Sequence, residues 1–129
     1  MKKRILCVDD EKDFRYLLTN MVSDWGYDIT CVGNAKEAIE MFEAFNPFLL
    51  ITDLRIDNHI DGATLADRLH RKDPMCIFVA ISGYLDAFDL GFLLGAVFTD
   101  VLQKPFDHNE LKKIIDYAWD KRCRWKEYL

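Results

Sequence analysis

Side chains that can carry out chemistry stand at the ends of four short apolar runs in this sequence. They are three carboxylates, one hydroxyl and one ammonium group: Asp9, Asp10, Asp53, Ser82 and Lys104. Short apolar runs rich in large and β-branched residues are typical of strands buried on both faces of a parallel sheet. Open parallel sheets place their chemistry just beyond the carboxyl ends of their strands, so we expect these five residues to meet at one edge.

Three carboxylates close together need a cation or a shared proton, because like charges raise one another's pKa. Oxygen ligands with few protein groups suit Mg²⁺, which keeps several waters and often binds beside phosphate. An Asp carboxylate can also accept a phosphoryl group covalently. Lys104 and Ser82 would then hold oxygens of the transferring group. The bond from Lys104 to Pro105 is a candidate for the cis form, which would aim the lysine into the site.

Each of these residues taken singly also has an ordinary structural explanation. An Asp or Ser after a strand is commonly a turn or helix-cap residue, and a lone lysine is commonly solvated. Their occurrence at four successive strand ends is what favours a site.

Strands and helices are expected to alternate along the chain. The predicted strands are residues 2–8, 27–32, 48–53, 76–82 and 98–103. The predicted helices are residues 14–25, 34–45, 63–71, 84–96 and about 107–126, with Asn34 and Asp107 as caps. This alternation predicts an α/β fold in which a five-stranded parallel sheet carries helices on both faces.

Composition narrows the class of protein further. A chain of 129 residues is expected to be one domain, and its net charge of -5 argues against a general nucleic-acid binder. No apolar run approaches the length of a membrane span, so we expect a soluble, cytoplasmic protein. The four cysteines are far apart and show no CxxC spacing, which favours reduced thiols over a zinc site.

Four segments carry a resemblance to a known family, namely residues 5–11, 50–54, 81–84 and 102–106. With them the chain resembles, over essentially its whole length, the receiver domain of two-component response regulators. The resemblance implies a flavodoxin-like, doubly wound (βα)5 fold with strand order 2-1-3-4-5. It also implies roles for the site residues: Asp53 as phosphoacceptor, Asp9, Asp10, Asp53 and the backbone carbonyl of Arg55 as Mg²⁺ ligands, Ser82 as switch hydroxyl and Lys104 as partner of the phosphoryl group.

Three positions depart from the family pattern. Ile56-Asp57 stands where Met-Pro is usual, and the loop to the following Asp-Gly looks one residue longer. Val101 replaces the aromatic residue three positions before the lysine, so the usual inward turn of a ring cannot operate in its ordinary form. Val97-Phe98 replaces the common Gly-Ala before the fifth strand.

The predicted helix at 84–96 is apolar nearly all round, unlike an ordinary surface helix. Its large apolar residues cannot all face the core: Leu90, Phe92, Leu93 and Leu94. We expect this helix, with the fifth strand and the last helix, to form a partner or homodimer surface; the alternative is burial under neighbouring loops. Residues 1–129 are expected to form a single receiver domain, either independent or part of a longer protein, whose last helix leads to a partner or an output domain.

Three classes of function are candidates for this sequence. The first is a phosphoacceptor switch served by a histidine kinase or phosphotransfer protein, with no enzymatic activity beyond its own phosphorylation and dephosphorylation. The second is a haloacid-type phosphatase, which needs a second Asp two residues after the nucleophile, where Arg55 stands. The third is a receiver-like interaction module that no longer relies on phosphorylation, a reading that Val101 and the altered loop leave open.

Overall fold

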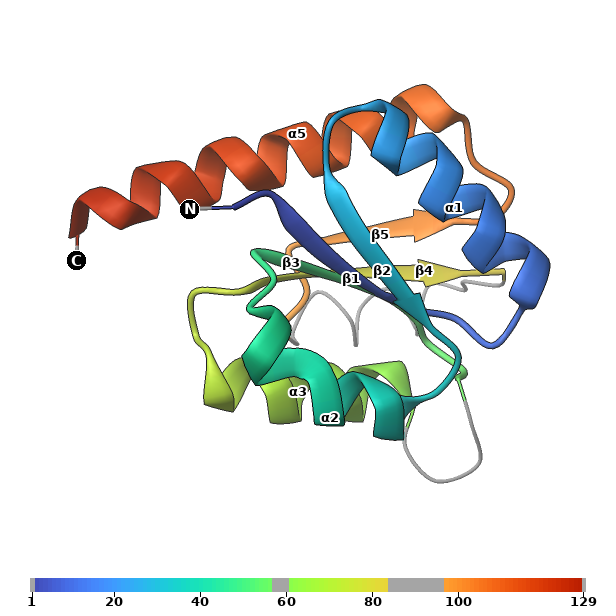
Figure 1. The fold of residues 1–129 in the computed structure, drawn as a ribbon, viewed down its shortest axis with the longest axis horizontal. Coiled ribbons are helices and arrows are strands. Elements are labelled where there is room, and N and C mark those ends of the chain that lie inside the picture. Colours follow the sequence, from blue (N-terminus) through green and yellow to red (C-terminus); the bar gives the residue numbers. More distant parts are fainter. Residues whose placement is uncertain (1, 57–60, 84–96, 129) are drawn as a thin grey trace.

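The computed structural model describes residues 2–56, 61–83 and 97–128, and it has a parallel sheet between two layers of helices (Figure 1). The sheet has the order β2-β1-β3-β4-β5, and each neighbouring pair of strands is parallel. The strands are β1 (Arg4–Val8), β2 (Asp28–Val32), β3 (Leu49–Asp53), β4 (Ile77–Ser82) and β5 (Asp100–Gln103). The predicted doubly wound fold and its strand order are confirmed.

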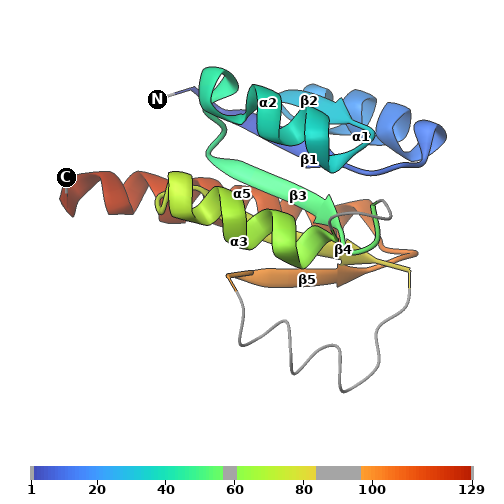
Figure 2. The ribbon, with the colours of Figure 1, turned by 90° about the horizontal axis from the view of Figure 1, so that it is seen from below.

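The described helices are α1 (Lys12–Asp24), α2 (Ala35–Phe45), α3 (Gly62–Lys72) and α5 (His108–Trp125), followed by a 3-10 turn at Lys126–Tyr128. Figures 1 and 2 show α1 and α5 on one face of the sheet and α2 and α3 on the other. The predicted helix at 84–96 lies outside the described residues. No helix in the described parts of the chain is long and apolar enough to cross a membrane.

Each face of the sheet has its own apolar core, because successive side chains of a strand point to opposite faces. The core toward α1 and α5 includes Ile5, Cys7, Leu18, Leu49, Ile51 and Leu111. The core toward α2 and α3 includes Leu6, Val8, Phe42, Leu50, Leu65 and Phe78. Both faces of the central strands are therefore buried, as their nearly continuous apolar runs predict.

Asn34 and Asp107 cap their helices as predicted, but not every hydrogen bond of a capping box forms. The Asn34 side chain accepts a hydrogen bond from the Glu37 N–H at 2.9 Å, as the capping box predicts. The Glu37 carboxylate accepts from the Gly33 N–H at 3.4 Å rather than from the Asn34 N–H. Asp107 caps α5 through the N–H of Asn109, one residue earlier than a capping box would use.

Gly62 starts α3 directly against the end of β3, and the absence of a side chain allows this approach. Its N–H donates to the Leu54 carbonyl at 2.9 Å. A Cβ atom at this position would overlap the Asp53 carbonyl oxygen and approach Leu54 Cα to 2.9 Å. Since both neighbours are backbone atoms, neither can move aside without shifting the strand that carries Asp53.

We therefore expect Gly62→Ala to lower the free energy of unfolding by about 3 kcal/mol, as backbone overlap does elsewhere. Urea denaturation of the parent and the variant measures this loss. Gly83→Ala is the matched control, because a Cβ atom there meets nothing within 4 Å. Equal losses in the two variants would contradict the steric explanation.

Candidate functional site

Asp9 follows β1 and is the most buried carboxylate of the site, with 1% of its surface exposed. Its Oδ1 accepts a hydrogen bond from the Glu11 N–H at 2.8 Å. Burial raises the pKa of Asp9, and the bonds from Glu11 and Lys104 offset this only in part. Asp9 is therefore a carboxylate whose charge the protein does not fully compensate.

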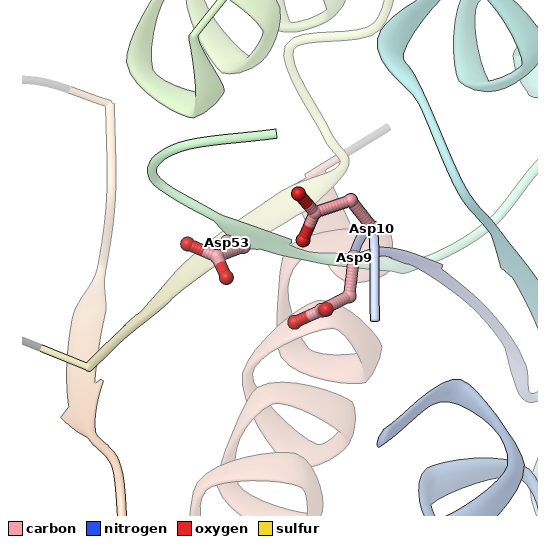
Figure 3. Close-up of side chains that lie close together, drawn as sticks. All are labelled: Asp9, Asp10 and Asp53. Carbon is pink, nitrogen blue, oxygen red and sulfur yellow. The ribbon is translucent and has the colours of Figure 1, made fainter. Parts of the chain in front are cut away.

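Asp10 and Asp53 complete a group of three carboxylates, shown in Figure 3. One carboxylate oxygen from each of Asp9, Asp10 and Asp53 lies within 4.8 Å of the others. Asp53 is the last residue of β3, and its Oδ1 accepts a hydrogen bond from the Arg55 N–H at 3.1 Å. The strand ends thus bring together the three carboxylates that the sequence singled out.

Lys104 supplies positive charge from the segment after β5. Its Nζ lies 2.9 Å from Asp9 Oδ2, 3.5 Å from Asp53 Oδ2 and 3.9 Å from Glu11 Oε1. Burial alone would lower the pKa of Lys104, but the hydrogen bond and charge of Asp9, helped by Asp53 and Glu11, raise it. The bond between Lys104 and Pro105 is cis, as the sequence suggested.

Ser82 is buried at the end of β4, and its carbonyl accepts a hydrogen bond from the Lys104 N–H at 2.7 Å. In the sheet register Asp53 lies beside Ile81, so Ser82 stands one residue further along the neighbouring strand. Arg55 lies in the loop after β3. The ligand role of its carbonyl and the switch role of the Ser82 hydroxyl remain predictions.

The proposed partner surface is described only in part. Val101 is half-buried in β5 beside Ala80 and packs against the core on the α2 and α3 face. The four apolar residues of the predicted helix lie outside the described residues: Leu90, Phe92, Leu93 and Leu94. The partner role of this surface is therefore still a prediction.

Burial of Asp9 raises its pKa, and the carboxylates around Lys104 raise the pKa of that ammonium group, so one cation faces more than one carboxylate and the site keeps excess negative charge. A small divalent cation would offset this charge, and the available ligands are all carboxylate oxygens. Hard oxygen donors with few protein ligands fit Mg²⁺ better than softer transition metals. Asp9, Asp10 and Asp53 are thus compatible with Mg²⁺ binding.

The charge excess predicts how stability depends on pH in buffer without Mg²⁺. Between the ordinary carboxyl pKa of about 4 and the raised pKa of Asp9, the folded protein keeps a proton that the unfolded chain releases. The Asp9 contribution therefore lowers the free energy of unfolding as the pH rises through this window.

We expect Asp9→Asn to remove this fall and to raise the free energy of unfolding at pH 7 by about 1 kcal/mol. Asn keeps an oxygen that accepts the Glu11 N–H, and Lys104 keeps Asp53 and Glu11 nearby. Urea titrations from pH 4 to pH 8, a range chosen around the carboxyl pKa, measure both profiles. A variant less stable than the parent at every pH would contradict the charge excess.

Two aromatic residues at the site were missed by the sequence reasoning. Lys104 Nζ lies 3.9 Å from the centre of the Phe14 ring, and Phe106 meets the same ring edge to face at 6.1 Å. Phe14 is the first apolar residue of α1, and its spacing predicted only a place on the apolar face of the helix. Its position beside the ammonium group depends on how α1 crosses the sheet. No short sequence pattern predicts that crossing.

Comparison with known proteins agrees with this geometry. Residues 5–116 match the response regulator receiver domain family. An uncharacterised 14.6 kDa protein of Leptolyngbya boryana is 35% identical over 113 residues, covering 86% of each chain. The alkaline phosphatase synthesis transcriptional regulatory protein PhoP of Bacillus subtilis is 31% identical over 86% of this chain and 46% of its own length.

Solved structures show the same fold. The signal receiver domain of a putative LuxO repressor protein from Vibrio parahaemolyticus superposes with a TM-score of 0.91 at 23% identity, covering 99% of this chain and 98% of that one. NtrX from Brucella abortus, solved with ADP, superposes with a TM-score of 0.91 at 26% identity, covering 99% of this chain and 29% of that one.

The fold and site define a class of regulatory signalling domains, and the chain belongs to the response regulator receiver domain family. It spans less than half the length of several curated relatives, including PhoP, but 86% of the Leptolyngbya protein.

Proposed function

We propose that this chain is a phosphoacceptor switch in which Asp53 receives a phosphoryl group from a histidine kinase or phosphotransfer protein in a Mg²⁺-dependent reaction. The observation that carries the proposal is the position of Asp53. Its carboxylate stands at the strand end, 3.5 Å from Lys104 and beside Asp9 and Asp10. A nucleophile, a fixed cation and a set of oxygen ligands are thus held at one place.

The chemistry follows from these groups. An Asp53 oxygen attacks phosphorus, forming an acyl phosphate while the bond from phosphorus to the donor breaks and the donor keeps the electron pair. Lys104 pairs with one oxygen of the transferring group, and the Ser82 hydroxyl donates to another. Asp9, Asp10, Asp53 and the Arg55 carbonyl would hold Mg²⁺, which would supply positive charge to offset the anionic phosphoryl group.

Phosphorylation adds a charge of about -2 at the sheet edge. Movement of Ser82 toward this charge shifts the population of conformations in the 84–106 region and changes partner binding. The partner is a second copy of the chain or an output domain, bound through 84–96, β5 and α5. In this proposal residues 1–129 act as one cytoplasmic receiver domain without further enzymatic activity, and α5 leads to the partner or output domain.

The proposal is tested with acetyl phosphate as a small phosphodonor and intact mass as the readout. The parent is expected to gain the mass of one phosphoryl group in Mg²⁺ and none when EDTA removes the metal. Size-exclusion chromatography of both forms then tests whether phosphorylation changes the oligomeric state. No mass gain, together with no Mg²⁺ binding, would contradict the switch.

A second candidate is an interaction module of receiver shape that does not use phosphorylation. Val101, in place of the family's switch aromatic, is the observation that favours it. Its side chain packs into the core on the α2 and α3 face and offers no ring that could turn. Partner binding that is unchanged by Mg²⁺, by acetyl phosphate and by substitution of Asp53 would favour this candidate.

A further inference from the structure

A basic pocket opens at the edge of the sheet opposite Asp53, where the strands begin. We use the name basic pocket for a cavity of about 310 Å³ between the start of β1, the turn before β3, the turn before β4 and the end of α5. Figure 1 shows the start of β1 beside the C-terminal part of α5. The pocket is distinct from the site around Asp53, because the length of β1 and β3 separates the two.

Positive charge gathers in this pocket although the chain as a whole has a net charge of -5. The charged residues that line it are four cations and one carboxylate: Lys2, Arg4, Arg122, Lys126 and Asp73. The carboxylate is already engaged, since Asp73 Oδ1 accepts a hydrogen bond from the Met75 N–H at 3.0 Å. Among the described residues, no ion pair joins Asp73 to any of the four cations.

Arg122 has unused capacity to donate hydrogen bonds. Its Nη1 is buried and has no hydrogen-bond partner within the described parts of the chain. Arg122 also lines the pocket, and no carboxylate among the described residues lies within ion-pair distance of it, so its positive charge is not neutralised there.

Arg4, which also lines the pocket, has only weak contacts with neighbouring acidic groups. Its Nε lies 3.8 Å from Asp28 Oδ2, at the limit of an ion pair, and Asp28 is largely exposed, where such pairs contribute little. Its Nη1 donates to the Phe45 carbonyl at 3.3 Å, which orients the guanidinium without neutralising it. Two guanidinium groups thus border one cavity, and planar guanidinium groups match the oxygens of phosphate.

We propose that the basic pocket binds the phosphate group of a small phosphorylated molecule. The four cations that line the pocket outnumber its one carboxylate, Asp73, so the lining is strongly positive. A phosphate ligand, with a charge of about -2, would neutralise more of this charge than a ligand with a single carboxylate would. The cavity volume is at the lower end of the range for small-molecule sites and suits a compact ligand. Binding here is independent of the reaction at Asp53.

The test is a titration of ¹⁵N-labelled protein with pyrophosphate and, separately, with inorganic phosphate, at constant ionic strength and without Mg²⁺. We expect amide shifts around Asn46, Phe48 and Asp73, which line the pocket. Arg122→Gln is expected to weaken binding by about tenfold or more, because charge-assisted hydrogen bonds are lost. Citrate at the same ionic strength tests whether carboxylates bind as well.

Arg124→Gln is the matched control, since it removes the same charge from the same helix at an exposed position outside the pocket. It is expected to change binding less than about twofold. Equal weakening in both arginine variants, shifts confined to the residues around Asp53, or equally tight binding of citrate would overturn the proposal. Asp53→Asn should leave pyrophosphate binding unchanged, so a failure here is distinguishable from a failure of the phosphoacceptor function.

Discussion

Phosphoryl uptake from acetyl phosphate is expected to fall to background when Asp53 is replaced by Asn. The amide has nearly the shape of the carboxylate but no anionic oxygen, so it cannot attack phosphorus. The fold should be retained, because the substitution removes one negative charge from a site with excess negative charge. Intact mass after incubation with Mg²⁺ and acetyl phosphate measures the loss directly.

The control for this prediction is Asp13→Asn. Asp13 lies in the first turn of α1, close in sequence to the site but exposed, and its loss changes the net charge equally. It should take up phosphate like the parent, while urea denaturation should show Asp53→Asn to be no less stable than the parent. Full uptake by Asp53→Asn would place the phosphoryl group on another residue and contradict the assignment.

Lys104→Met is expected to affect both chemistry and stability. Removing one fixed donor to a transferring group commonly slows a reaction by about 100-fold or more, and we expect a loss of this size in the rate of phosphoryl uptake. Without Mg²⁺ at pH 7 the free energy of unfolding should fall by about 2 kcal/mol. The cause is Asp9, whose carboxylate is 1% exposed and would lose its bond to Lys104.

A double-mutant cycle identifies the cause of this destabilisation. In the Asp9→Asn background the buried charge is already absent, so adding Lys104→Met should lower the free energy of unfolding by less than about 0.5 kcal/mol, instead of the about 2 kcal/mol expected in the parent. Added Mg²⁺ should also reduce the loss in Lys104→Met, since a cation then replaces the ammonium group. If Lys104→Met costs the same free energy of unfolding in both backgrounds, the contact between Lys104 and Phe14, not the ion pair with Asp9, holds the site together.

Local pattern was sufficient to predict the framework of the site. Asp53 closes an apolar run that is typical of a buried strand, and the same argument places Asp9 and Ser82 at strand ends. Because parallel strands end at one edge, their meeting followed without coordinates. Strand limits were less certain: β5 begins at Asp100, two residues later than predicted, since Phe98 is buried just before the ladder starts.

The chemical differences within the site were decided by tertiary structure. Asp9 and Asp10 are neighbours with the same side chain, yet Asp9 is buried against Lys104 and Asp10 is exposed. Both residues follow the last residue of β1, so strand alternation does not separate them, and only the packing of α1 determines that Phe14 lies beside Lys104.

The sequence by itself determined the family, the fold and the set of residues at the strand ends, because all of these follow from periodicity and short motifs. Only the tertiary structure revealed the basic pocket, whose cations come from the two ends of the chain. Arg4 and Arg122 show no pattern in the sequence, since α5 brings them together only by packing along the sheet. Contacts of this kind depend on where a helix crosses a strand, and side-chain spacing along one segment does not encode that.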